Sequence, residues 1–267
     1  MPKGTGKLKQ LHILSKFVVG KQEDNRMEEL GGLLNLHGSL EIENLENVID
    51  GNEARSARII DKKNIEELLL KWYVSSGDDM VSNTHTDEQD ILQGLQPNRV
   101  LKVLEIDGYK GCRNICRWPE GGLPPNLKEL RVGGCEEHVR GLSWMGNLDN
   151  LTHLTISGFG CESIKSYPEV GSLPRLPSLT TLHIQDFDNL ETLECNELLR
   201  LTSLQQLHIS YCKRLKNMEG ENLPPSLLLL KIYDCGLLGE HCKNKHQQIW
   251  PRISHIATIE VDDDQIF

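Results

Sequence analysis

The stretch LTSLQQLHISYCKRL, residues 201–215, contains the pattern that decides the fold of this chain. Leu204, Leu207, Ile209, Cys212 and Leu215 are apolar, and the residues between them are polar or carry a polar aromatic ring. Leu207 and Ile209 lie two residues apart, which is the spacing along one face of a strand and not along an amphipathic helix. The stretch therefore predicts one short strand.

The same pattern recurs about ten times, at a period close to the roughly 20–29 residues of leucine-rich repeats. Its central residue falls at Leu11, Leu40, Leu68, Leu104, Leu130, Leu154, Leu182, Leu207, Leu230 and Ile259. One such strand cannot bury its apolar face alone, so successive repeats are expected to stack around a shared core. We therefore predict an α/β fold, a right-handed leucine-rich-repeat solenoid or horseshoe. Its parallel β-sheet would line the concave face, with loops and short helices on the convex face.

Three segments follow from the spacing of the repeats. Residues 1–74 would hold about three N-terminal repeats, residues 75–96 an acidic insertion loop and a short helix, and residues 97–267 about seven C-terminal repeats with a cap. The insertion SSGDDMVSNTHTDEQD, residues 75–90, is polar and has no apolar period, which is typical of a surface loop. Near the end, Trp250 and Ile253 are expected to cover the last repeat, ahead of a terminal strand and an acidic tail. At the front, Leu8 and Leu11 are expected to begin the first strand directly.

Composition limits the classes of partner. The formal net charge is −10 and the pI about 5.5, which disfavours non-specific binding to nucleic acid or to an anionic membrane. The sequence contains no apolar run of about 18 residues, and its start, MPKGTGKLKQ, lacks the apolar core of a secretory signal. We expect no nucleic-acid or membrane partner, and a location in the cytoplasm, with the nucleus as a second.

The eight cysteines suggest buried thiols and not a metal site or a disulfide framework. Cys135, Cys212 and Cys235 each follow the last apolar residue of a strand by three, where leucine-rich repeats place a small buried side chain. The spacing of Cys112 and Cys116, and the group of Cys and His residues between 235 and 246, do not match a zinc ribbon or finger. No metal is expected, and lone ladder cysteines favour a reduced, intracellular setting.

The sequence lacks residues that the motifs for catalysis and cofactor binding require. GTGKL, residues 4–8, looks like part of a phosphate-binding loop, but a leucine stands where the hydroxyl residue is needed, and no strand precedes it. The ten histidines are scattered, and no nucleophile elbow of the G-x-S-x-G type occurs. We expect a protein that is not an enzyme, with no catalytic residue and no cofactor.

The residue directly after each central leucine should point away from the core. This column reads Glu41, Leu69, Glu105, Arg131, Thr155, His183, His208, Lys231 and Glu260, with His12 assigned to the first repeat. His183 and His208 should be neighbours, because adjacent strands lie about 4.8 Å apart. Two readings stay open for them, an ordinary polar lining and a mildly basic, pH-sensitive contact patch. Aromatic residues mixed with cations are typical of interaction hot spots. We predict a partner-binding surface made of Arg131, His183, Gln185, His208, Tyr211, Lys231 and Tyr233.

Several long segments resemble a known family. They are LHILSKFVVGK (11–21), LHGSLEIENLENVIDGNEARSARIIDKKNIEELLLKW (36–72), GLQPNRVLKVLEIDGYKG (94–111) and LPPSLLLLKIYDCGLLGEHCKNKHQQIWPRISHIATIEVDDD (223–264). They resemble the leucine-rich-repeat region of plant coiled-coil, nucleotide-binding, leucine-rich-repeat disease-resistance proteins. GYKGCRNICRWPEGG departs from the family pattern, which leaves the repeat register around Cys112–Trp118 open.

The resemblance implies a recognition and autoinhibitory role in an intracellular immune receptor. The implied protein partners are a pathogen effector or a guarded host protein, and the nucleotide-binding domain of the parent receptor. The family's coiled-coil and nucleotide-binding parts are absent from this sequence. The alternatives are the substrate-recognition repeat module of a ubiquitin ligase, for which no F-box helices are present, and a free-standing decoy or regulator. An extracellular receptor ectodomain and a hydrolase are disfavoured by the observations above.

Overall fold

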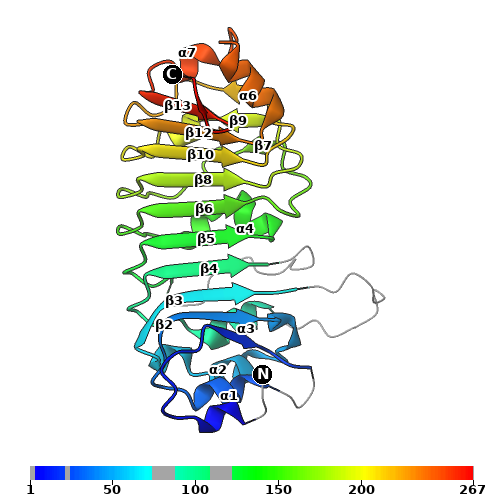
Figure 1. The fold of residues 1–267 in the computed structure, drawn as a ribbon, viewed down its shortest axis with the longest axis vertical. Coiled ribbons are helices and arrows are strands. Elements are labelled where there is room, and N and C mark those ends of the chain that lie inside the picture. The colour runs from blue at the N-terminus through cyan, green and yellow to red at the C-terminus, as the bar shows by residue number, and fades with distance from the viewer. Residues whose placement is uncertain (1–3, 22–24, 74–87, 109–121, 267) are drawn as a thin grey trace. The chain divides into compact units, whose positions relative to one another are not determined.

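The computed structural model describes residues 4–21, 25–73, 88–108 and 122–266, and the chain forms two compact units, Met1–Leu127 and Lys128–Phe267. Each unit contains a β-sheet of short, mostly parallel strands, and the connections between the strands hold short helices and turns (Figure 1). The expected α/β leucine-rich-repeat fold is confirmed. The segment bounds at residues 74 and 96 stay a prediction.

In the first unit, parallel strands follow one another in chain order, because each repeat contributes one strand and then returns. They are β1 (Lys16–Val18), β2 (His37–Glu43), β3 (Asn64–Lys71) and β4 (Val103–Asp107). The connections hold α1 (Met27–Gly31), α2 (Gly51–Ser56), α3 (Glu88–Leu95) and 3-10 turns at Thr5–Lys7, Leu45–Asn47 and Ile59–Asp61. Asp50 caps α2 by accepting a hydrogen bond from the Glu53 amide at 2.8 Å.

The second unit has two sheets. The main sheet contains β5 (Glu129–Gly133), β6 (His153–Ser157), β8 (Thr181–Gln185), β10 (Gln206–Ser210), β12 (Leu229–Tyr233), β13 (Thr258–Val261) and β14 (Asp264–Gln265). The second sheet contains β7 (Ser166–Tyr167), β9 (Thr192–Glu194) and β11 (Asn217–Glu219). The helices are α4 (Glu136–Arg140), α5 (Cys195–Leu198), α6 (Gly236–Lys243) and α7 (Trp250–Ile253), with a 3-10 turn at Leu142–Met145.

The core of each unit lies on one face of its main sheet. Nine of the ten central residues of the pattern are fully buried, so the leucine spacing identifies the core face correctly. The second apolar residue of each of these strands, from Ile42 to Val261, is at most 3% exposed. Burying one such Leu or Ile side chain contributes about 1.5–3 kcal/mol. The opposite face of the main sheet, called the open face below, carries the alternate residues.

The first repeat is the exception, and its expected strand is wrong. Phe17 and Val19 are fully buried, whereas Leu8 and Ile13 are 57% and 69% exposed and Leu11 is only partly buried. Lys16 pairs with Glu41, so Lys16 holds the position in the column that the sequence assigned to His12. A phenylalanine and a valine fill the core here, and a search for leucines misses them. His12 instead lies beside His37, with ring centroids 5.5 Å apart.

The last two strands, β13 and β14, extend the main sheet beyond β12. Ile253 in α7 is fully buried, and the Lys245 ammonium lies 4.7 Å from the centroid of the Trp250 ring. β13 pairs in parallel with β12, and β14 pairs antiparallel with β13. The residues expected to form an acidic tail therefore include an edge strand. The insertion between residues 75 and 87 and the register around Cys112–Trp118 lie outside the described residues.

Candidate functional site

The open face of the second unit brings most of the predicted partner-binding residues together. The register of the main sheet places Arg131 beside Thr155, Thr155 beside His183, His183 beside His208 and His208 beside Lys231. Gln185 is the last residue of β8 and Tyr233 the last residue of β12, each two residues after the row residue of its strand. Both are paired with Ser210. The predicted column is thus confirmed as a geometric row, while its role in binding stays a prediction.

His183 and His208 stack on each other at the centre of this row. Their ring centroids are 4.2 Å apart and their planes meet at 18°. Burial lowers the pKa of His183 to about 4, and the pKa of His208 is also lowered, by burial and by the nearby Lys231 ammonium. Both rings are therefore neutral at pH 7. Neutral rings favour the ordinary polar lining over the mildly basic contact patch, and the role of the pair stays a prediction.

A second aromatic pair lies at the carboxyl ends of the neighbouring strands. Tyr211 and Tyr233 pack edge to face with centroids 5.6 Å apart, and they are 45% and 39% exposed. At the end of β8, next to β10, Gln185 donates a hydrogen bond to the Asp186 carboxylate at 2.8 Å, and Ser157 of β6 donates to the same carboxylate at 3.2 Å. Aromatic rings that are exposed and rigidly packed make good anchors at protein interfaces.

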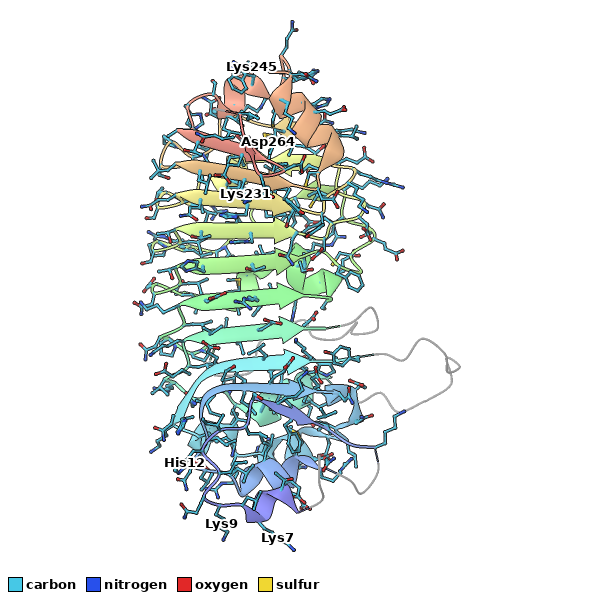
Figure 2. All side chains as sticks on the ribbon, viewed as in Figure 1. Lys7, Lys9, His12, Lys231, Lys245 and Asp264 are labelled. Carbon is cyan, nitrogen blue, oxygen red and sulfur yellow. The ribbon has the colours of Figure 1, made fainter. Side chains whose placement is uncertain are left out.

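The two predicted cations are held in ion pairs at opposite ends of the row. Arg131 bonds to Glu129, with Nη2 and Oε1 2.7 Å apart. Lys231 Nζ lies 3.0 Å from Asp263 and 3.5 Å from Glu260, at the end of the sheet where Figure 2 labels Lys231 and Asp264. Exposed ion pairs of this kind contribute about 0–1 kcal/mol, so a partner could exchange them at little cost. The His183–His208 stack at the centre of the row is neutral, and charged side chains lie at both ends of the row.

The sequence reasoning missed one feature of this surface, a row of residues with left-handed backbone. The residue two positions after the second buried residue of the strand has a positive φ in six repeats. Five of these are the residues that tolerate this conformation best, namely Asn44, Gly134, Asp186, Asp234 and Asp263. The sixth is Tyr211, with φ 56°. A bulky aromatic residue there is strained, and such strain is concentrated at functional sites. The aligned repeats contain the signal, since Tyr211 stands where the two neighbouring repeats have Asp186 and Asp234.

The strain at Tyr211 makes a testable prediction. Tyr211→Asn and Tyr233→Asn both remove the same ring contact, but only the first relieves a left-handed backbone. We expect the free energy of unfolding of Tyr211→Asn to be at least about 1 kcal/mol higher than that of Tyr233→Asn. Urea unfolding of the two variants side by side measures the difference. Equal stability, or a more stable Tyr233→Asn, would show that Tyr211 is not strained.

Phe159, just after β6, is a further residue that the sequence reasoning left out. Its side chain is 46% exposed, although it follows the second buried residue of its strand by three, like the buried Phe187 and Cys212. In this repeat Cys161 is buried instead, two residues later. The segment Gly158–Gly160 therefore turns the Phe159 ring outward, whereas the usual spacing would have buried it.

The remaining sequence motifs have structural roles. The amides of Gly4 and Gly6 in GTGKL donate to the Glu29 carboxylate, so the groups that would hold a phosphate are occupied by the chain's own side chain. Cys135, Cys212 and Cys235 are buried, and the Cys212 amide donates to the Cys235 sulfur at 3.4 Å. Among the described residues, no group of three or more His, Cys, Asp or Glu could hold a metal ion. The same residues include no helix long and apolar enough to span a membrane.

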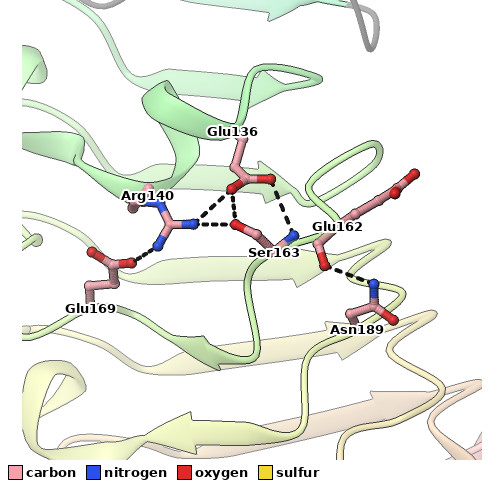
Figure 3. A network of polar contacts seen from close by, with 6 residues as sticks. All are labelled: Glu136, Arg140, Glu162, Ser163, Glu169 and Asn189. Atoms are coloured by element: carbon pink, nitrogen blue, oxygen red, sulfur yellow. Dashed lines mark hydrogen bonds and ion pairs between the residues drawn. The ribbon is translucent and has the colours of Figure 1, made fainter. Parts of the chain in front are cut away.

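A polar network outside the main sheet is internally satisfied (Figure 3). The Arg140 guanidinium pairs with Glu136 at 2.7 Å, contacts the Ser163 hydroxyl and forms an ion pair with Glu169. A pocket of about 340 Å³ beside it is lined by Arg140, Glu169, Glu194 and the 87%-exposed Val170. Because its guanidinium bonds Glu136 of its own helix as well as Ser163 and Glu169 of the following repeat, Arg140 serves to hold neighbouring repeats together.

The fold defines the class of protein, a leucine-rich-repeat protein. Residues 27–159 match the family described as R13L1/DRL21 leucine-rich repeats, and the chain is a repeat region of this type, as found in plant disease-resistance proteins.

The similarity to individual relatives extends over most of the chain. A candidate disease resistance protein from Arabidopsis thaliana, RPP13-like protein 1, is 34% identical over 239 residues, which is 83% of this chain. Two proteins from Solanum bulbocastanum, the candidate disease resistance protein RGA1 and the disease resistance protein RGA2, are each 29% identical, over 97% and 87% of this chain. The chain spans 22% of the length of each of these three relatives.

Proposed function

We propose that the chain is the partner-recognition part of an intracellular plant immune receptor, and that the open face of residues 128–267 receives the partner. The observation that carries this proposal is the presence of two aromatic pairs across β8, β10 and β12, the His183–His208 stack and the Tyr211–Tyr233 pair. The neutral stack at the centre of the row and the charged side chains at its ends match the anatomy of protein interfaces, where a few desolvated aromatic residues dominate the binding energy.

The partner in this proposal is a protein, either a pathogen effector or a host protein that the receptor guards. The names of the relatives support a role in disease resistance, and the share of their length that the chain covers supports a role as one region of a longer receptor. In that setting the repeats would also contact the nucleotide-binding domain and hold it inactive. The cytoplasm, with access to the nucleus, is the location that this role requires.

Affinity capture with matched variants tests the recognition surface. The first variant carries His183→Ala, His208→Ala and Tyr233→Ala on the open face. The control variant carries Lys213→Ala, Glu219→Ala and Glu221→Ala, at exposed positions between β10 and β11, in β11 and after β11. Each protein is immobilised and then incubated with plant leaf extract. The retained proteins are quantified by mass spectrometry. The partner should be lost at least about tenfold from the first variant and be retained by the control, because removing hot-spot side chains costs about 2 kcal/mol or more.

The dissociation constant of the purified partner then gives the same comparison in solution. An increase of at least about tenfold for the open-face variant, with the control unchanged within about twofold, is the expected result. If every captured protein is retained equally by both variants, the open face is not the recognition surface.

A further inference from the structure

The Tyr211–Tyr233 pair is set in a row of carboxylates. In the register of the main sheet, Asp186, Tyr211 and Asp234 directly follow the last paired residues of β8, β10 and β12, and Asp263 lies two residues beyond the last residue of β13 that pairs with β12. Neighbouring strands lie about 4.8 Å apart, so Asp186 and Asp234 flank Tyr211 at that spacing on either side. The strand ends on both sides of this exposed aromatic residue therefore carry an aspartate.

The carboxylates nearest Tyr211 are not neutralised by cations of the chain. Asp186 accepts hydrogen bonds only from the neutral groups of Gln185 and Ser157, and the exposed Asp234 forms no ion pair within the described part of the chain. The cations of this end of the sheet are committed to other carboxylates: Lys231 pairs with Asp263 and Glu260, and Lys243 with Asp262 and Asp264. The two aspartates beside Tyr211 are therefore not paired with a cation of the described residues.

We propose that this site receives an arginine side chain from a basic segment of the partner protein. A guanidinium stacks on the face of a tyrosine within about 6 Å of its centroid, and its planar fork binds carboxylates on both sides at once. The net charge of −10 would draw a basic partner toward the chain from a distance. The strained backbone of Tyr211 is consistent with selection for a ring at this place. This inference rests on the proposed function, because it names the chemistry of the partner at that same surface.

Lysine, by contrast, is expected to bind more weakly. Its ammonium is a compact and strongly hydrated charge that cannot stack on the ring and reach both aspartates together. The site therefore predicts a preference for arginine over lysine, and this preference separates it from simple attraction to an acidic protein.

A capped peptide, acetyl-GSGRGSG-amide, serves as the probe, with lysine and citrulline versions as its controls. Citrulline keeps the planar shape of arginine but carries no charge. Binding is followed by NMR through the ring signals of Tyr211 and Tyr233 at about 0.15 M salt, where long-range attraction is largely screened. We expect saturable shifts with the arginine peptide and binding at least about tenfold weaker with citrulline, with lysine in between.

Matched variants locate the site on the chain. The double variant Asp186→Asn and Asp234→Asn keeps the shape of the row and removes two charges. Glu219→Gln and Glu221→Gln remove the same charge at exposed positions on and after β11. The first is expected to weaken arginine binding at least about fivefold and the second to leave it unchanged within about twofold.

Two outcomes would overturn the inference. Equal binding of the arginine and citrulline peptides would show that charge is not recognised, and equal effects of the two double variants would show non-specific attraction. Neither outcome bears on the proposal that the open face binds the partner. If the open-face variant still loses its protein partner, the recognition role stands and only the preference for arginine is lost.

Discussion

Replacing Gly158 by alanine is expected to lower the free energy of unfolding by about 3 kcal/mol, because the new methyl group would enter the ring of Phe187. A Cβ at Gly158 would lie 2.3 Å from two carbons of that ring. The ring cannot retreat, since Phe187 is fully buried and packs against Tyr167 with centroids 5.0 Å apart. The backbone is fixed as well, by the hydrogen bond from the Gly158 amide to the Gln185 carbonyl at 2.8 Å.

A double-mutant cycle separates this contact from any other effect of the alanine. Phe187→Ala alone should cost about 3–5 kcal/mol. In that background the methyl group at position 158 has space, so Gly158→Ala should cost less than about 1 kcal/mol. Gly236→Ala is the matched control, since a Cβ there meets no atom within 4 Å and the position opens α6. A loss at Gly158 no larger than that at Gly236, measured by urea unfolding, would contradict the packing described here.

His138 should make the chain sensitive to acid. This residue of α4 is 3% exposed, stacks on Trp144 with centroids 4.7 Å apart, and has its Nε2 buried without a hydrogen-bond partner. Burial lowers the pKa of His138 to about 4 from its ordinary 6.5. Above pH 6.5 the ring is neutral in both the folded and the unfolded chain. Between pH 6.5 and 4 only the unfolded chain takes up the proton, so stability falls as the pH falls, by about 3 kcal/mol in total.

His138→Phe keeps the stacked ring and removes the titrating group. The variant is expected to lose about 3 kcal/mol less stability than the wild type between pH 7.5 and pH 4. His183, whose pKa is also lowered to about 4 by burial, remains and causes part of the fall in both proteins. His255→Gln, at an exposed position, is the control and should follow the wild type. Urea unfolding at these two pH values avoids the region near the pI of 5.5. Parallel losses in wild type and His138→Phe would show that His138 titrates normally.

The leucine pattern predicts the main sheet because burial on one strand face is a local property of the sequence. Once the central leucines are aligned, neighbouring strands must pair in register, and the stacking of His183 on His208 follows. The first strand could not be found in this way, since Phe17 and Val19 replace the expected leucine and isoleucine. The second sheet was not predicted from the sequence either. Its strands are two or three residues long and arise from pairing between repeats, without an apolar period of their own.

The properties of the candidate site were less accessible than its residues. The seven predicted side chains could be placed from the column and the strand ends, but their electrostatics depend on neighbours in space. Whether His183 is charged depends on how deeply its neighbours bury it, and whether Lys231 is available depends on Asp263, which lies in the last turn of the chain. The strain at Tyr211 could have been predicted, because only the comparison of its column with Asp186 and Asp234 was needed.

Site-specific photo-crosslinking in plant cells tests the central claim most directly. A benzophenone amino acid replaces Tyr211 or Tyr233 on the open-face side in two versions of the chain, and the exposed Glu221 beyond β11 in a third. If the open face of residues 128–267 receives the partner, the same protein will be crosslinked from positions 211 and 233 and not from position 221. Crosslinking from position 221 alone, or equally from all three positions, would contradict recognition by this surface.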